Sequence, residues 1–293
     1  MKNNFRKQLS LFITCCFATT FFIDLVIYKN GGLAKFNLVP FQMLVPALAA
    51  ILVLWITKDK PVLKSLGFRF FKMKHLLAGS GVIVLCVLLS YVVSSLFIKD
   101  LFIGPKELNA HLLRSGIPFK TGSVLFNMSI LVGINILIGP VVNLPIFLGE
   151  EVGWRAFMMP RLLQYNKKYA FIIGGIVWSL WHGPIIAMGH NYPAYPFLGN
   201  LLFILFCIPT GYIFYYFFKK SGSVFIPALM HGVLNKAAMI MVVYCVDEKK
   251  IHPLYHGAAG ITGVVAFSIV ALVLWKIDKS NSGTDRDNKE SLK

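Results

Sequence analysis

Long runs of apolar residues, separated by short polar segments, set the pattern of this chain. Eight such runs occur, at about 9–28, 37–57, 76–97, 123–145, 170–188, 198–218, 223–246 and 257–275. Each holds roughly 20 residues, the helical length that crosses a bilayer core about 30 Å thick. The runs are continuous rather than alternating, and a lipid-embedded backbone must satisfy its hydrogen bonds internally. The pattern therefore predicts an all-α polytopic membrane protein with about eight transmembrane helices.

Composition supports the membrane assignment and narrows the partners. Hydrophobic residues make up 57% of the 293 residues and charged residues only 14%, whereas a soluble domain carries about 25% charged residues. We expect one transmembrane domain over 1–275 in the cell membrane, and a polar tail at 276–293 that is solvated and disordered. The net charge of +17 lies mostly in short segments between the runs, so we assign it to anionic lipid rather than to nucleic acid.

The distribution of basic residues predicts the orientation of the spans. If the N-terminus is cytoplasmic, the inner segments carry nineteen Lys and Arg residues and the outer segments carry eight. Segments rich in Lys and Arg stay on the cytoplasmic side of a membrane. We therefore expect both termini to be cytoplasmic. The segment 58–75, with six basic residues, gives the strongest signal.

A few polar side chains interrupt the apolar runs, and ionisable groups within membrane segments are costly enough to suggest a function. They are Glu150, Glu151, Arg155, His182, His231 and Asn235. Residues four apart on a helix lie on one face, so Glu151 can pair with Arg155 while Glu150 points about 100° away. The remaining histidines lie in loops or at span ends, and we interpret them as surface residues: His75, His111, His190, His252 and His256.

The segment from 123 to about 164 is too long for one straight span. Pro140 and Pro145 predict a kink or a break within it. Gly149 and Gly153 form a pair of small residues four apart, which allows a second helix to approach closely. We therefore expect the two glutamates to lie after a break, in a tightly packed part of the bundle.

Counted from the basic ends of their helices, Glu150, His182 and His231 lie at similar depth in the predicted cytoplasmic half of the membrane. A carboxylate beside an imidazole activates water for attack on a carbonyl group, and an imidazole with an amide four residues on can stabilise an oxyanion. The same Glu and two His also match the ligand set of a catalytic zinc, although His-Glu-x-x-His is missing. A divalent metal such as zinc therefore stays an alternative. A Glu151–Arg155 pair alone would be equally typical of a structural, charge-neutralising contact.

Three motifs make the resemblance to a known family specific. They are Glu-Glu-x-x-x-Arg at 150–155, followed by Pro160-Arg161-Leu162, an aromatic-x-x-x-His at 178–182, and His-x-x-x-Asn at 231–235. Over about residues 120–245 the chain resembles the CAAX-prenyl-endopeptidase and bacteriocin-processing (CPBP) family. This family includes CAAX prenyl protease 2-like, lysostaphin-resistance protein A-like and abortive-infection membrane proteins. Ala156, where many members have Gly, and Trp178, where Phe is common, are mild departures.

The resemblance implies an intramembrane endopeptidase whose site opens toward the cytoplasm. Glu150 would activate water together with His182, and His231 and Asn235 would stabilise the oxyanion, with Glu151 and Arg155 in supporting roles. The implied substrate is a protein or a peptide, such as a lipidated tail or a leader peptide. Two alternatives stay open: a non-catalytic immunity or scaffold protein of the same fold, and a proton-coupled transporter, which the lack of visible repeats disfavours.

Overall fold

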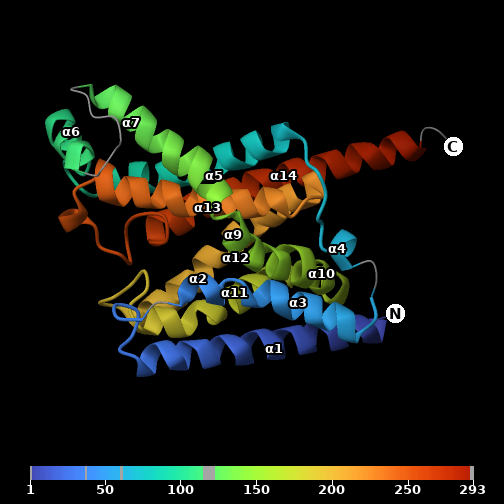
Figure 1. The fold of residues 1–293 in the computed structure, drawn as a ribbon. Coiled ribbons are helices and arrows are strands. Elements are labelled where there is room, and N and C mark those ends of the chain that lie inside the picture. Colours follow the sequence, from blue (N-terminus) through green and yellow to red (C-terminus); the bar gives the residue numbers. More distant parts are fainter. Residues whose placement is uncertain (1, 37, 60–61, 115–122, 291–293) are drawn as a thin grey trace.

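Helices account for all of the regular secondary structure in the part of the chain that the structure describes. The computed structural model covers residues 2–36, 38–59, 62–114 and 123–290. Within them, eight helical segments are long and apolar enough to cross a membrane. These are α1 (Lys2–Lys29), α2 with α3 (Val39–Gln42 and Val45–Ile56), α5 (Met73–Ser95), α7 to α8 (Val124–Val142), α11 (Ala170–Ala187), α12 (Pro196–Ser221), α13 with η3 (Phe225–Ile240 and Met241–Cys245) and α14 (Ile261–Glu290). The predicted all-α fold with eight spans is confirmed, with boundaries that differ by a few residues (Figure 1).

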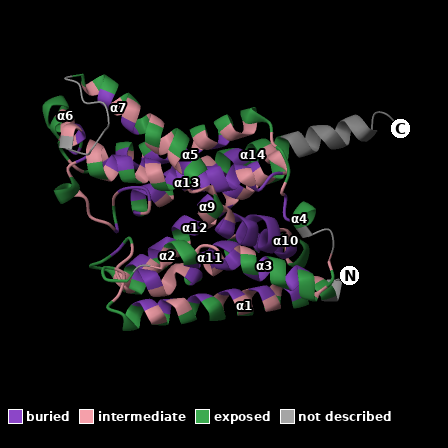
Figure 2. Ribbon diagram, viewed as in Figure 1, coloured by how far each residue is buried: buried purple, intermediate pink, exposed green. Residues whose placement is uncertain are grey.

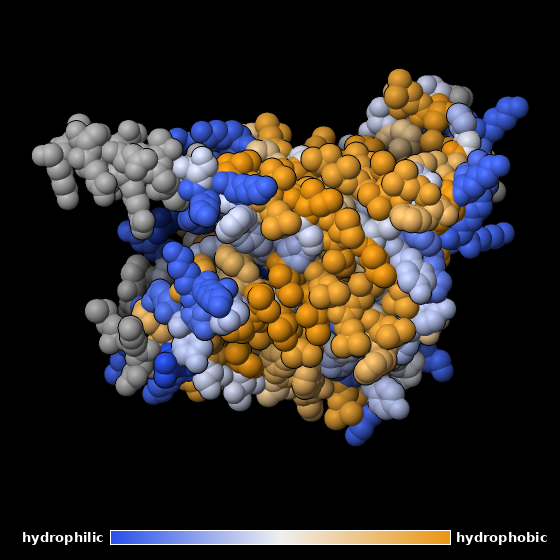
Figure 3. Space-filling model, turned by 180° about the vertical axis from the view of Figure 1, so that it is seen from behind, coloured by the Kyte–Doolittle hydropathy of each residue, from blue (hydrophilic) through white to orange (hydrophobic). Residues whose placement is uncertain are grey.

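The surface of the bundle is that of a multi-pass membrane protein. Large apolar side chains such as Phe22, Trp55 and Leu137 are exposed along the helices. Figure 3 shows hydrophobic side chains across the middle of one face and hydrophilic ones gathered at its two ends. A soluble monomer rarely exposes so large an apolar surface, because burial of apolar area drives folding in water. Lipid therefore surrounds the middle of the helices.

Both ends of the chain lie at the same end of the bundle (Figure 1), as an even number of spans requires. The connections 188–195 and 246–260 lie at the opposite end, together with 96–104. There, the Tyr192 hydroxyl donates a 2.6 Å hydrogen bond to the Ala259 carbonyl, and the amide of Asp247 donates to the Leu101 carbonyl. We call these the terminal end and the loop end of the bundle.

The segment that precedes and carries the glutamates is broken, as its length and prolines predicted. It consists of α7 (Val124–Val132), the π-helix η1 (Gly133–Ile138), α8 (Gly139–Val142), a turn at Asn143, α9 (Leu144–Glu151), the π-helix η2 (Val152–Met158) and α10 (Met159–Tyr165). Its two halves differ in surroundings: the first half is largely exposed, whereas α9, η2 and α10 are buried in the bundle (Figure 2). The break thus returns the chain from the lipid-facing surface to the interior.

Two glycines let this buried half approach a second broken span. A Cβ atom on Gly149 would lie 2.3 Å from the Met43 carbonyl oxygen, and one on Gly153 would lie 2.4 Å from the Cβ of Pro46. Met43 lies in the turn between α2 and α3 and Pro46 lies in α3, so α9 and η2 pack directly against this turn and the start of α3. The predicted close approach at Gly149 and Gly153 is confirmed, and it fixes the backbone on both sides of the two glutamates.

One polar segment differs from the expectation. The segment after Lys276 is helical through Glu290 rather than disordered, because α14 continues past its apolar part. Asp278 holds it by ion pairs with Lys219 at 2.9 Å and Lys220 at 3.6 Å, at the end of α12. In the connection between α5 and α7, α6 (Pro105–Arg114) forms a short helix, and 115–122 and 291–293 lie outside the described residues. The five cysteines are free.

We predict that Gly153→Ala lowers the thermal unfolding temperature of the purified protein, because the added methyl group would overlap Pro46. Overpacking of this kind costs roughly 1–3 kcal/mol. Gly81→Ala on α5 is the matched control, since nothing lies within 4 Å of a Cβ built there. Equal unfolding temperatures for both variants in detergent would contradict the close packing of η2 against α3.

Candidate active site

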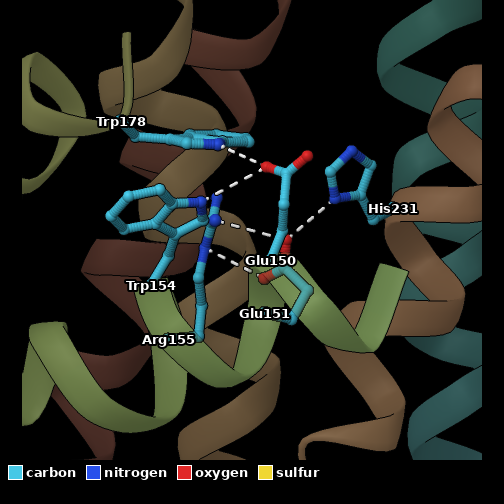
Figure 4. Close-up of polar contacts among 6 residues, drawn as sticks. All are labelled: Glu150, Glu151, Trp154, Arg155, Trp178 and His231. Carbon is cyan, nitrogen blue, oxygen red and sulfur yellow. Dashed lines mark hydrogen bonds and ion pairs between the residues drawn. The ribbon is translucent and has the colours of Figure 1, made fainter. Parts of the chain in front are cut away.

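Three separate helical segments bring the polar side chains of the membrane interior together. Glu150 and Glu151 end α9, and Arg155 follows in η2. Trp178 and His182 lie on α11, and His231 and Asn235 lie on α13. Figure 4 shows both glutamates between the indole rings on one side and the His231 ring on the other. The fold therefore brings the three motifs together, as expected.

Two indole groups hold the Glu150 carboxylate. Its Oε2 atom accepts hydrogen bonds from Nε1 of Trp178 at 2.8 Å and from Nε1 of Trp154 at 3.3 Å. The side chain is 1% exposed. An indole N–H only donates, so this pair suits an acceptor that carries negative charge. The second carboxylate oxygen points away from the indoles (Figure 4) and is free for other partners.

Glu151 joins its own helix to α13. Its carboxylate lies 3.1 Å from Nε and 3.2 Å from Nη1 of Arg155, and its Oε1 lies 2.9 Å from Nδ1 of His231. The Arg155 guanidinium also stacks over the Trp178 ring, at 3.8 Å from the ring centre. The expected Glu151–Arg155 pair is thus present, and it extends to His231. Glu150 is left out of this ion pair, as its position on the helix predicted.

The two histidines are each fixed through one ring nitrogen. Nδ1 of His182 lies 2.9 Å from the Trp178 carbonyl oxygen, which can only accept, so this nitrogen carries the hydrogen. Nδ1 of His231 donates in the same way to Glu151. Nε2 of each ring makes no hydrogen bond within the described part of the chain. Both rings therefore present a nitrogen with a lone pair when they are neutral.

A cavity of about 580 Å³ lies beside these groups. Its lining includes Glu150, His182, His231 and Asn235, the four residues that the sequence predicted to be catalytic. Asn235 is exposed although it lies in the middle of α13, because it faces this cavity. Most of the remaining lining is aromatic or aliphatic, and Glu150 is the only Asp, Glu, Lys or Arg among the described lining residues.

The interpretation of His190 and His256 as surface residues was wrong. Both line the cavity, and both are only partly exposed. His190 lies in the connection after α11, between Gly189 and Asn191, which both have positive φ angles. Burial, helped by the positive charge that His182 can carry, lowers the pKa of His190 to about 4, and Glu150 opposes the shift. No sequence spacing places these loop residues at the cavity.

The position of the cavity along the bundle bears on the expected orientation. The described cavity lining includes His190, Asn191 and the segment 256–260 at the loop end, and no residue from a connection at the terminal end. The site therefore lies toward the loop end. A cytoplasmic N-terminus, expected from charge, and a site open to the cytoplasm, implied by the family resemblance, exclude each other in this fold.

Glu150, His182 and His231 are also the candidate ligands for a metal ion. The hydrogen bonds of His182 and His231 to a carbonyl and a carboxylate are of the kind that orient metal-binding imidazoles. Even so, no three His, Cys, Asp or Glu side chains in the described ranges converge closely enough to share an ion. As the side chains stand, Glu150, His182 and His231 do not fit a metal centre.

We predict that acidification weakens the fold through His190. Its pKa in the folded protein, about 4, lies below the ordinary value of 6.5, so the neutral form is favoured by folding. The stability from this group is complete above pH 6.5 and is lost as pH falls toward 4, by at most about 1.4 kcal/mol per pH unit. His190→Gln should flatten the fall of the unfolding temperature between pH 7 and 4.5, whereas His111→Gln should not. Identical curves for both variants and the parent would refute this.

Known proteins are similar to this chain over the region that carries the three motifs. The family model described as Rce1-like, type II CAAX prenyl endopeptidase, matches residues 120–237, which include all three motifs. A curated relative, the CAAX prenyl protease 2 of Methanococcus maripaludis, is 29% identical over 132 residues. This match covers 43% of the present chain and 45% of the relative, so the chain spans less than half of the relative's length. The resemblance to the CPBP family that the motifs indicated is thereby confirmed for residues 120–237.

Proposed function

We propose that the chain is a CAAX-type intramembrane endopeptidase that cleaves a peptide bond with a water molecule activated by Glu150. The main support is the placement of Glu150: a buried carboxylate has one oxygen held by two indoles and the other free beside a cavity. The match of residues 120–237 to Rce1-like endopeptidases supports the same reaction class.

In the proposed reaction, a water molecule lies between Glu150 and Nε2 of His182, both of which line the cavity. Nε2 accepts one hydrogen bond from the water and Glu150 takes a proton from it. The water oxygen forms a bond to the carbonyl carbon, and the carbonyl electrons move onto the carbonyl oxygen. Glu150 then returns its proton to the leaving nitrogen as the C–N bond breaks. The products are a carboxylic acid and an amine.

His231 and Asn235 are proposed to stabilise the oxyanion of this intermediate. They are one helical turn apart on α13 and line the same cavity. The side-chain amide of Asn235 donates without any change of protonation. His231 already uses Nδ1 on Glu151, so a donation from Nε2 requires a second proton, whose charge the Glu151 carboxylate would balance. Glu151 and Arg155 are thus supporting residues in this scheme.

The proposed substrate is a protein or peptide segment that enters an apolar cavity. The walls are mainly aromatic and aliphatic, which suits an uncharged stretch of chain around the scissile bond. The curated relative is named as a CAAX prenyl protease, and a lipidated tail or a leader peptide are both compatible with such walls. The lipid bilayer is the second proposed partner of the protein.

We predict that Glu150→Gln and His182→Ala each lower the rate of peptide cleavage by about 10²–10⁴, the usual contribution of general acid–base catalysis. The measurement is cleavage of a quenched fluorescent peptide library by protein purified in detergent. Glu248→Gln, at an exposed position outside the cavity, is the matched control and should keep the parent rate. Equal cleavage by all variants would contradict the catalytic assignment and favour a non-catalytic membrane protein.

We also predict that a chelator such as EDTA leaves the cleavage rate unchanged, because the scheme assigns every step to protein side chains and water. Loss of cleavage on chelation, with recovery on addition of zinc, would instead require Glu150, His182 and His231 to rearrange around an ion.

A further inference from the structure

The described lining of the cavity extends to the loop end of the bundle. Its described lining includes His190, Asn191 and residues 256–260, which belong to the two connections at the loop end. The Tyr192 hydroxyl, bonded to the Ala259 carbonyl, joins these two connections over the site. Val39 and Met43 at the loop-end part of the α2–α3 span also line it. A substrate that reaches Glu150 along this cavity comes from the loop end.

The opposite side of the site is closed by packed side chains. Trp154, which holds Glu150, packs edge-on against Phe12 of α1, and Phe12 packs against Phe157. All three side chains are buried. They place aromatic rings between Glu150 and the terminal end.

A partly buried polar cluster links the helices further toward the terminal end. Nε of Arg161 donates to Gln8 at 2.9 Å, and Gln8 in turn donates to Thr57 and Asp59. The Arg161 guanidinium also lies over the Phe157 ring, at 3.7 Å from its centre. These contacts tie α1, the end of α3 and α10 together. The site therefore has an apolar and then a polar barrier on this side.

The charges of the chain separate along the same axis. The sequence segments at the terminal end carry nineteen Lys and Arg residues, and those at the loop end carry eight. Without the last 18 residues, whose end lies outside the description, the terminal end still carries fourteen. The excess remains in short segments close to span ends, which is where the orientation rule applies.

From the position of the cavity at the loop end and the excess of Lys and Arg at the terminal end, we propose that the cavity opens on the non-cytoplasmic face of the membrane. The terminal end, rich in Lys and Arg, is cytoplasmic, so the loop end with its cavity faces outward. The inferred class of peptide substrate rests on the proposed function, whereas the inferred orientation of the cavity does not.

The substrate class follows from the same placement. The segment that enters comes from the outer side and passes walls with no described Lys, Arg or Asp and with Glu150 only at the site itself. It is therefore the apolar, membrane-proximal part of an exported or membrane-anchored polypeptide. A cytoplasmic tail would have to cross the sealed side of the bundle to reach Glu150.

Cysteine labelling in intact cells tests the orientation without any need for proteolysis. Single variants of the full chain, Lys249→Cys at the loop end and Lys64→Cys at the terminal end, are exposed to a membrane-impermeant maleimide. The parent, with its five free cysteines, gives the background. We expect Lys249→Cys to react at least tenfold faster than Lys64→Cys in intact cells, and both to react after permeabilisation. Reaction of Lys64→Cys alone in intact cells would overturn the proposal.

A third variant tests the cavity itself. Asn235 faces the cavity and is exposed, so Asn235→Cys should be labelled from outside in intact cells. Protection of Asn235→Cys in intact cells, with reaction only after permeabilisation, would overturn the outward opening even if Lys249→Cys reacts. Failure of the proposed proteolysis is seen separately, as equal cleavage by the parent and Glu150→Gln, and it leaves the labelling result intact.

Discussion

The ion pair between Glu151 and Arg155 is the interaction on which the rest of the site depends. Both side chains are fully buried inside a membrane protein, where an unpaired charge is very costly. Removing one partner of such a pair typically costs about 3–5 kcal/mol. Because Glu151 also accepts from His231, the pair joins the helix of the glutamates to α13. Because Arg155 stacks on Trp178, the pair also reaches α11, whose indole holds Glu150. The Glu151–Arg155 ion pair thus orients side chains of all three motifs.

Backbone packing supplies the second constraint. Gly149 and Gly153 allow α9 and η2 to rest on the turn between α2 and α3, so the glutamates cannot shift along their helix without a clash with Met43 or Pro46. Helices in lipid gain little from the hydrophobic effect and associate through such close contacts. The two broken spans therefore act as a rigid support for Glu150, and polar contacts act on a backbone that is already placed.

Much of this was predictable from the sequence because it depends on local spacing. Apolar runs of membrane-spanning length gave the eight spans, and residues four apart gave the Glu151–Arg155 pair. Trp154 as a second donor to Glu150 has the same spacing and was there to be found. The inward position of His190 and His256 depends on how two distant connections fold over the cavity, which no local pattern encodes. The direction of the cavity was missed for the same reason, since depth along single helices does not say which end is sealed.

The separation of Glu150 from the Glu151–Arg155 pair has a consequence for the electrostatic cost of hydrolysis. With the second proton that the proposed scheme requires on His231, the carboxylates of Glu150 and Glu151 are balanced by Arg155 and His231, and the negative charge beside the cavity is that of Glu150. When a water proton moves to Glu150, this charge vanishes there while an equal charge forms on the substrate oxygen. The total never changes, so negative charge is translated across the cavity and no new ion is created. In a medium of low dielectric constant, moving a charge by a few ångströms costs far less than separating an ion pair from neutral groups.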